Sequence, residues 1–283
     1  MKNILILGSA GQIGGHLTYY LKKKNYKVFQ FDIVDDIAND LRIKNNQKLI
    51  KLVKKVDYIF FLAFDVGGSV YLKKFQFSKK FLINNLQIMT NTFETLSKYK
   101  KPFLFASSQM SNMSYSNYGI LKLIGEKVTD SMNGIYVKFW NVYGIEKDKR
   151  KSHVITDFVI KAFQKNKIDM LTNGLETREF LYADDCCKGL EIIMKNHNKF
   201  KKNKNELHLT TGIKTKIKDI LKIIKVIFKN KNISVKIVPG KAKDTVQLNR
   251  NNINNNFLKK YWKPKTSMKN GINNIIKYYE RKS

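Results

Sequence analysis

A tyrosine and a lysine stand one helical turn apart in the run Tyr118-Gly119-Ile120-Leu121-Lys122. On a helix, this spacing places the phenol and the ammonium group on one face. An ammonium close to a tyrosine stabilises the phenolate and lowers the pKa of the phenol. The phenolate can then take a proton from a sugar or alcohol hydroxyl while a hydride leaves the carbon for a nicotinamide. The pair therefore predicts hydride-transfer chemistry.

Ser108 adds a third polar group, because the buried strand predicted over 103–106 ends at Ser107-Ser108. From there its hydroxyl can hydrogen-bond the same substrate oxygen. A Y-x-x-x-K pair also arises by chance in a chain with 54 lysines and arginines, so its meaning depends on the elements around it. We interpret Ser108, Tyr118 and Lys122 as catalytic because an oxygen-rich strand end precedes the pair and a nucleotide-binding turn opens the chain.

That turn follows a short apolar run, Ile4 to Leu7, which predicts a strand buried on both faces of a parallel sheet. Three glycines follow the strand at a spacing of three residues. Gly8 can turn the chain tightly, Gly11 lets the backbone approach a pyrophosphate, and Gly14 lets the next helix pack close to the strand. The helix begins near Gln12, with its free N–H groups facing the phosphates. We assign cofactor binding in this turn to Gly8, Ala10, Gly11, Gln12, Ile13 and Gly14.

An acidic residue follows the second predicted strand, which runs from Tyr26 to Phe31 and ends at Asp32. A carboxylate at about this offset from the glycines accepts hydrogen bonds from both hydroxyls of an adenosine ribose. It also repels a 2′-phosphate, so the pattern favours NAD over NADP. The competing interpretation is a glycine turn in an ordinary α/β protein, and we favour the dinucleotide site.

The remaining pattern predicts an α/β fold, a Rossmann-type doubly wound parallel sheet with a smaller C-terminal substrate lobe. Strands are expected over 56–63, 103–106 and 134–139, with long helices over 79–99 and 117–132. Beyond Gly144 the segments shorten. We expect an NAD-binding domain over 1–145, its sheet partly completed by later segments, and a lobe mainly over 146–283, interleaved with the first. A ligand cleft is expected between them, at the carboxyl ends of the strands.

Composition narrows the class of protein. The chain of 283 residues is 43% hydrophobic, which suffices for a sizeable core, and carries a net charge of +32. Only five of the 54 basic residues are arginines, so we attribute the charge to a bias towards lysine rather than to nucleic-acid binding. No apolar run predicts a membrane span, and the histidines lack metal-ligand spacing. A cytoplasmic protein without a metal is expected.

Taken in order, these motifs resemble the extended short-chain dehydrogenase/reductase family, the NAD-dependent sugar-nucleotide epimerases and dehydratases. The resemblance covers nearly the whole chain. It is carried by Gly8-x-x-Gly11-x-x-Gly14, Leu62-Ala63, Ser107-Ser108, Tyr118-Gly119-x-x-Lys122-x-x-Gly125-Glu126, Asn141-Val142-Tyr143-Gly144, Thr177-Arg178-x-Phe180-x-Tyr182-x-Asp184-Asp185 and Trp262-x-Pro264.

The resemblance implies a role for each matched position. Ser108, Tyr118 and Lys122 match the catalytic residues; the latter two also match cofactor contacts, and Ser108 a substrate contact. Further cofactor contacts are implied at Asp40 and Leu41, on the adenine side, and at Leu62 and Ala63. Contacts to a nucleotide-diphosphate sugar are implied at Asn141, Arg178, Lys241 and Asp244. The helices over 79–99 and 117–132 match a four-helix homodimer interface.

Departures from the family pattern narrow the reaction. Dehydratases carry an Asp-Glu pair where this chain has Gln109 and Met110, which cannot act as acid or base, so dehydration is not expected. The run Ser152-His153-Val154-Ile155 resembles the GDP-fucose synthase and GDP-mannose 3,5-epimerase branch, but the cysteine that acts with that histidine is missing. His153 is therefore a substrate-binding or a structural residue. Lys138 stands where arginine is common.

We expect an NAD-dependent sugar-nucleotide epimerase that acts at C4 through a transient 4-keto sugar. Two alternatives stay open. The same residues serve a sugar-nucleotide 4-ketoreductase or 4-dehydrogenase that releases its cofactor each turnover. A non-catalytic Rossmann module that binds RNA or regulates another protein also fits the charge.

Overall fold

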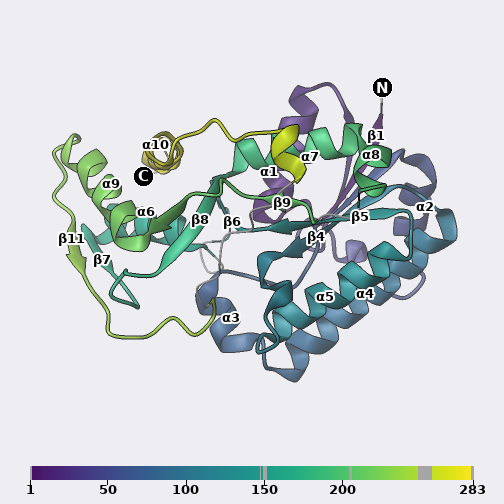
Figure 1. Cartoon of the computed structure of the whole chain (residues 1–283), viewed down its shortest axis with the longest axis horizontal. Helices are drawn as coiled ribbons and strands as arrows, with labels where there is room; N and C mark the ends of the chain where they lie inside the picture. Colours follow the sequence, from purple (N-terminus) through teal and green to yellow (C-terminus); the bar gives the residue numbers. More distant parts are fainter. Residues whose placement is uncertain (1, 147, 149–151, 204–205, 248–256, 282–283) are drawn as a thin grey trace.

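In the computed structural model, which describes residues 2–146, 148, 152–203, 206–247 and 257–281, parallel strands form a central sheet of order β2-β1-β3-β4-β5-β9 (Figure 1). Successive residues of the first strand point to opposite faces, because Ile4 and Ile6 join one buried cluster and Leu5 and Leu7 the other. The strands are β1 (Asn3–Leu7), β2 (Lys27–Phe31), β3 (Tyr58–Phe61), β4 (Phe103–Ser108), β5 (Gly134–Phe139) and β9 (His208–Leu209).

Helices cover both faces of this sheet, which explains why β1 and β3 are almost entirely apolar. One face packs against α1 (Gln12–Lys23), α7 (Ala183–Lys195) and α8 (His197–Lys201). The other packs against α2 (Gln47–Lys55), α4 (Lys79–Tyr99) and α5 (Asn117–Asp130), and the last two lie side by side in Figure 1. The predicted doubly wound α/β fold is confirmed.

A smaller lobe holds its own buried cluster beside the sheet (Figure 1). A mixed sheet of order β10-β8-β6 and a parallel pair of β11 and β7 belong to this half. Its elements are β6 (Asn141–Tyr143), α6 (Val154–Lys165), β7 (Lys167–Asp169), β8 (Thr177–Tyr182), β10 (Lys214–Lys216), α9 (Ile217–Lys229), β11 (Lys236–Val238) and α10 (Met268–Glu280).

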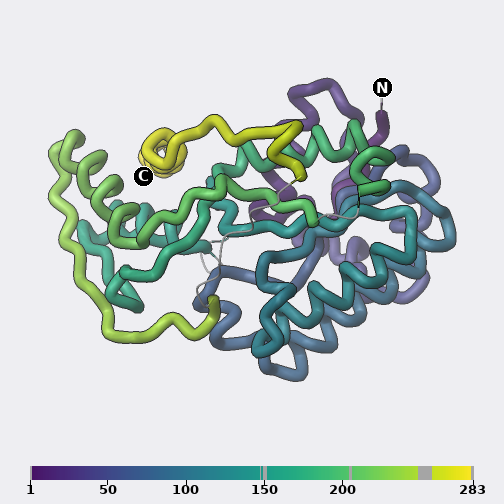
Figure 2. The backbone as a smooth tube through the Cα atoms, viewed as in Figure 1, coloured from purple at the N-terminus to yellow at the C-terminus, as the bar shows by residue number. Residues whose placement is uncertain are grey.

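The chain passes between the two halves more than once. After the lobe begins, β9 returns to pair with β5 in the central sheet. After β11 the chain, yellow-green in Figure 2, runs back towards the other half, and Val246 is buried in the same cluster as Leu5 and Leu7 of β1. Residues of the lobe are thereby brought to the edge of the central sheet.

The strand order reverses between β1 and β3, because the chain moves from β1 to β2 on one side and then crosses to β3 on the other. Ligands of open α/β sheets bind outside the carboxyl ends of the strands at such a reversal. The ends of β1, β3 and β4 carry the glycine turn, Leu62-Ala63 and Ser107-Ser108, respectively. The topology therefore places three predicted site segments along one edge.

The predicted element limits were close, with some corrections. The third strand is shorter than the predicted 56–63, β4 continues over the two serines, and α5 ends at Asp130 rather than at 132. Helix α3 (Ser69–Phe75) and the 3-10 turns η1 (Ile37–Asn39), η2 (Gln109–Asn112) and η4 (Phe257–Lys260) were not predicted. None of the described helices is long and apolar enough to cross a membrane.

A buried histidine lies at the amino end of β3, away from the predicted site. His197 is the first residue of α8, and its Nδ1 hydrogen-bonds the hydroxyl of Tyr58, the first residue of β3, at 3.1 Å. The imidazole is 8% exposed, and its Nε2 is buried without a partner among the described residues. Burial, followed by the charges of Lys201 and Lys2, lowers the pKa of His197 to about 4. Protonation therefore favours the unfolded chain, whose imidazole titrates near 6.5.

We predict that this histidine destabilises the protein in acid. As pH falls from 6.5 towards 4, the wild type should lose about 2 kcal/mol of unfolding free energy relative to a His197→Gln variant. Denaturant unfolding of both proteins across this pH range measures the difference. Parallel stability curves would contradict the prediction.

Candidate functional site

Two glycines at the turn after β1 stand where a side chain has no room. Gly8 has φ of +85°, and a Cβ added there would lie 2.6 Å from the backbone nitrogen of Ala63. A Cβ at Gly14 would lie 2.0 Å from the Gly8 carbonyl oxygen. Contacts this short are impossible without moving the backbone. The start of α1 is therefore held directly against the ends of β1 and β3.

This turn has the features of a pyrophosphate site. No side chain caps α1, whose N-cap is Gly11, so the first N–H groups of the helix, including those of Gln12 and Ile13, are left for a ligand or water. The Gln12 side chain instead donates to the Val142 carbonyl oxygen at 3.3 Å, which ties the helix start to β6. The backbone donors and the space kept free of Cβ atoms fit a dinucleotide.

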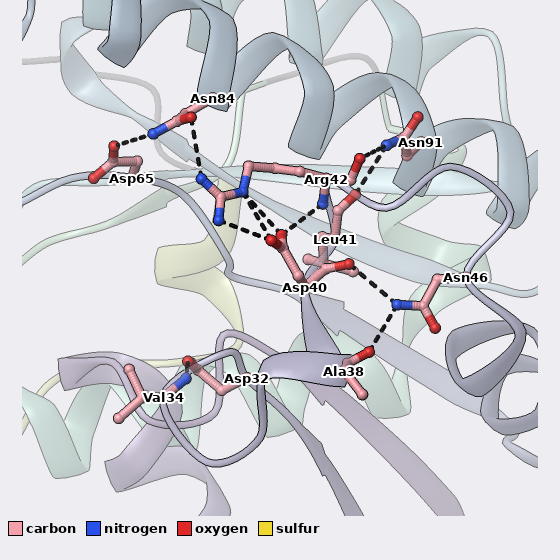
Figure 3. Close-up of polar contacts among 10 residues, drawn as sticks. All are labelled: Asp32, Val34, Ala38, Asp40, Leu41, Arg42, Asn46, Asp65, Asn84 and Asn91. Atoms are coloured by element: carbon pink, nitrogen blue, oxygen red, sulfur yellow. Dashed lines mark hydrogen bonds and ion pairs between the residues drawn. The ribbon is translucent and has the colours of Figure 1, made fainter.

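Asp32 joins the end of β2 to the same turn. One of its carboxylate oxygens accepts from the Ala10 N–H at 3.0 Å, and the other accepts from the Val34 N–H at 3.0 Å. Figure 3 shows the second of these bonds. The Asp32 carboxylate, which is predicted to bind the ribose, is thus fixed beside the turn that is predicted to bind the pyrophosphate.

The predicted adenine-side residues lie in a polar network (Figure 3). The Arg42 guanidinium donates to the Asp40 carboxylate at 2.8–3.0 Å and to the Asn84 side-chain oxygen at 3.2 Å. Burial alone would raise the pKa of Asp40, but the hydrogen bonds and charge of Arg42 outweigh it and lower that pKa. Leu41 is buried, and its carbonyl accepts from Asn91 of α4 at 3.2 Å. The loop is thereby anchored to α4.

The structure brings together the three predicted catalytic residues. Ser108, at the end of β4, lies beside the half-buried Tyr118 of α5. Burial raises the pKa of Tyr118 to about 12, although the hydrogen bond from Ser108 lowers it. The serine oxygen accepts from the Met110 N–H at 3.1 Å, so the hydroxyl proton of Ser108 stays available for donation.

Lys122 is buried one turn after the tyrosine. Its Nζ donates to the Ala106 carbonyl oxygen at 2.6 Å and lies 3.6 Å from the centre of the Phe64 ring. Burial lowers the pKa of Lys122 to about 7, against a smaller raising effect from Glu126. A charged Lys122 beside Tyr118 would favour the phenolate, and its burial opposes that charge.

A pocket joins the end of the central sheet to the lobe. It contains the predicted substrate contacts Asn141 and Arg178, and Gln109 from the turn after β4. Sequence reasoning missed its other walls, although Trp140 and Thr177 adjoin predicted residues. The full lining is Gln109, Trp140, Asn141, Thr177, Arg178, Glu179, Lys214 and Gln247.

Two predicted substrate residues pair with one another. The Arg178 guanidinium forms an ion pair with Asp244 and donates to the Gln247 carbonyl oxygen at 2.6 Å. The Asp244 carboxylate also accepts from the Val246 N–H at 2.9 Å. This contact fixes the direction of the arginine fork at the pocket and ties the segment after β11 to β8.

The structure does not bring the other two predicted substrate residues to this pocket. The His153 imidazole lies 2.6 Å from the carboxylate of Glu146, which also accepts from the His153 N–H at 2.8 Å. His153 is thus the N-cap of α6, oriented by a buried acid. Lys241 is exposed and does not line the pocket.

The family model described as "NAD dependent epimerase/dehydratase family" matches residues 4–207. The chain belongs to this family. The predicted resemblance to sugar-nucleotide epimerases and dehydratases of the extended short-chain dehydrogenase/reductase family is confirmed, and NAD is the cofactor. The protein is an enzyme, so the alternative of a non-catalytic module is set aside.

Several relatives are distant in sequence and cover nearly the whole chain. CDP-abequose synthase of Salmonella muenchen is 23% identical over 301 residues, which cover 99% of this chain and 98% of the relative. A UDP-glucose 4-epimerase from Thermotoga maritima, solved with UDP-glucose, shares the fold with a TM-score of 0.74, 20% identity and 99% coverage of both chains. A GDP-6-OMe-4-keto-L-xylo-heptose reductase from C. jejuni reaches 0.83, with 19% identity and coverage of 100% and 98%.

The close contact at Gly14 gives a matched test of the cofactor turn. Gly14→Ala should abolish NAD binding in calorimetry, because its Cβ would displace the Gly8 carbonyl. Gly15→Ala is the control, since its Cβ would meet only the Ser9 carbonyl oxygen, at 3.8 Å. Equal NAD affinity in the two variants would contradict the assignment.

Proposed function

We propose that the protein is an NAD-dependent sugar-nucleotide 4-epimerase. The observation that carries the proposal is the placement of Ser108 beside Tyr118, with Lys122 buried next to them at the edge of the sheet that holds the glycine turn. The UDP-glucose 4-epimerase from Thermotoga maritima, which shares the whole fold, supports the choice of reaction.

In this proposal, Tyr118 removes the proton of the C4 hydroxyl of the sugar and later returns it. Ser108 donates to the phenol oxygen, and the Lys122 ammonium stabilises the phenolate. NAD, when bound, supplies reversible hydride uptake. After the hydride has left, the 4-keto sugar rotates within the pocket. The hydride then returns to the other face of the sugar, so that the configuration at C4 is inverted.

The nucleotide diphosphate is proposed to lie against Arg178 and Asn141. A guanidinium fork matches phosphate oxygens, and Arg178 is one of only five arginines in the chain. Asp244 orients this fork, and Lys214 adds a second positive charge to the pocket wall. His153 and Lys241 do not line the described pocket. We therefore propose that they contact the substrate only at the margin of this pocket.

Net reduction or oxidation at C4 is the second candidate, and the fold shared with the C. jejuni reductase favours keeping it. The same three residues serve both reactions. An epimerase retains NAD on purification and consumes none, whereas a ketoreductase or dehydrogenase consumes stoichiometric cofactor. Dehydration is not proposed, because Gln109 and Met110 supply neither an acid nor a base after Ser108.

Tyr118→Phe tests the role of the phenol. The variant should lose turnover by about a thousandfold or more while it still binds NAD, because only the proton-transferring oxygen is removed. Substrate is found first by a melting-shift screen of UDP-, GDP-, CDP- and dTDP-sugars with the wild type. Unchanged turnover in the variant would refute the assignment.

We also propose a homodimer through α4 and α5. These adjacent helices expose apolar side chains at helical spacing, and the exposed fractions are 44% and 39% for Ile83 and Leu86 of α4. On α5, Ile124 is 43% exposed, and Ile120 and Leu123 continue its face at 39% and 37%. A second copy that packs the same helices against them would cover this apolar surface, forming a four-helix interface.

Ile124→Glu should convert such a dimer to a monomer, since it places a charge in the middle of the proposed interface. Light scattering coupled to size exclusion measures the mass. Val226→Glu, at a site 51% exposed on α9, is the control and should leave the dimer intact. A monomeric wild type, or a dimeric Ile124→Glu variant, would overturn the proposal.

A further inference from the structure

Charged side chains alternate in sign behind the candidate catalytic pair. Lys122 and Glu126 lie one turn apart on α5, Lys138 lies on β5, and Glu206 precedes β9. The first three are 3%, 3% and 0% exposed. Buried charges persist only when they are paired and hydrogen-bonded. The charge on each member therefore depends on its neighbours.

Glu126 contacts polar side chains of β4 and β5. One of its oxygens accepts from the Ser107 hydroxyl, next to Ser108 on β4. The other lies 3.5 Å from Lys138 Nζ. Lys138 also pairs with Glu206 and donates to the Asn112 side-chain oxygen at 3.0 Å. Glu126 thus stands between two buried lysines.

Glu206, the last charged residue of this series, is a separate partner for Lys138. The Trp140 indole N–H donates to His208 Nδ1 at 3.1 Å, so Nδ1 is an acceptor and the imidazole proton is on Nε2. Nε2 then donates to Glu206 at 3.1 Å. This hydrogen bond, followed by Lys138, holds the pKa of Glu206 at about 2 although burial opposes it. Glu206 therefore stays charged and neutralises Lys138.

Lys122 has no comparable partner of its own among the described residues. Its Nζ meets a carbonyl oxygen and the faces of Phe64 and Phe105, at 3.6 and 5.0 Å. The strand β4 and the turn η2 present uncharged side chains to it, and α5 presents Tyr118 and Glu126. Burial lowers the pKa of Lys122, and the charge of Glu126 is what raises it.

We propose that Glu126 is a positioning residue whose carboxylate keeps the buried Lys122 ammonium charged beside Tyr118, while Lys138 draws on the same carboxylate and limits that effect. Removal of Glu126 leaves two buried lysines with only Glu206, so Lys122 gives up its proton. Removal of Lys138 leaves Glu126 to act on Lys122 alone. The consequence for turnover rests on the proposed function, but the charge coupling does not.

The coupling can be measured without substrate. Because the Lys122 pKa is lower in the folded protein than the usual 10.5, the stability of the wild type relative to Lys122→Met falls with decreasing pH and levels off below the folded pKa, at about 7. The pH at which this stability difference levels off is measured by denaturant unfolding across a pH series. The measurement is repeated with Glu126→Gln present in both proteins of the pair, and again with Lys138→Met present in both. Glu126→Gln should move the levelling point down by about one pH unit, and Lys138→Met should move it up.

Glu126→Asp, which keeps the charge, is the matched control and should level off near the wild-type pH. If Glu126 had a purely structural role, every variant would be less stable. The pH at which the stability difference levels off would then not move in opposite directions in Glu126→Gln and Lys138→Met. An unmoved point, or movement in the same direction in both backgrounds, would overturn the proposal. Opposite movements support it even if no nucleotide sugar is turned over, in which case only the proposed function fails.

Turnover provides the second readout. With an active substrate, Glu126→Gln should lower kcat by about tenfold or more with little change in KM, because the tyrosine loses its charged neighbour and the pocket is untouched. Glu126→Asp should recover most of kcat. A Glu126→Gln variant with wild-type kcat would overturn the role in catalysis.

Discussion

The contact of the Gly8 backbone with both Ala63 and the start of α1 is the constraint on which the site depends. It fits glycine alone, because a Cβ at Gly8 or Gly14 would collide with backbone atoms. The contact brings an uncapped helix start to the reversal point of a parallel sheet, where its N–H groups and dipole favour a pyrophosphate. Asp32 then fixes the same turn to β2.

A second close approach carries the chemistry to that edge. A Cβ at Gly119 would lie 2.1 Å from the Met110 carbonyl oxygen, and one at Gly125 would lie 2.3 Å from the Phe105 ring. With glycine at both positions, α5 lies directly on β4 and the turn after it. Tyr118 thereby reaches Ser108, and Lys122 is buried against strand carbonyls. The cost is a desolvated ammonium, which needs a counter-charge nearby.

Local patterns sufficed for much of this architecture, and α4 has the limits that its periodicity predicts. The glycine turn, Asp32 and the three catalytic candidates could be predicted because each motif is local in the sequence. Contacts between distant segments carry no such signal: the pairing of Arg178 with Asp244 and that of Glu126 with Lys138 depend on how strands are ordered in space. The contact of His153 with Glu146 carries no sequence signal either, since Glu146 lies in a loop seven residues before it.

The most direct test of the central claim follows the hydrogen at C4 of the sugar. A nucleotide sugar carrying deuterium at C4 is incubated with the purified protein, and the product is examined by NMR and mass spectrometry. A phenol at position 118 that works over a bound nicotinamide predicts deuterium kept at an inverted C4, with no net use of cofactor. Loss of the deuterium to water, or inversion in protein stripped of NAD, would contradict the account.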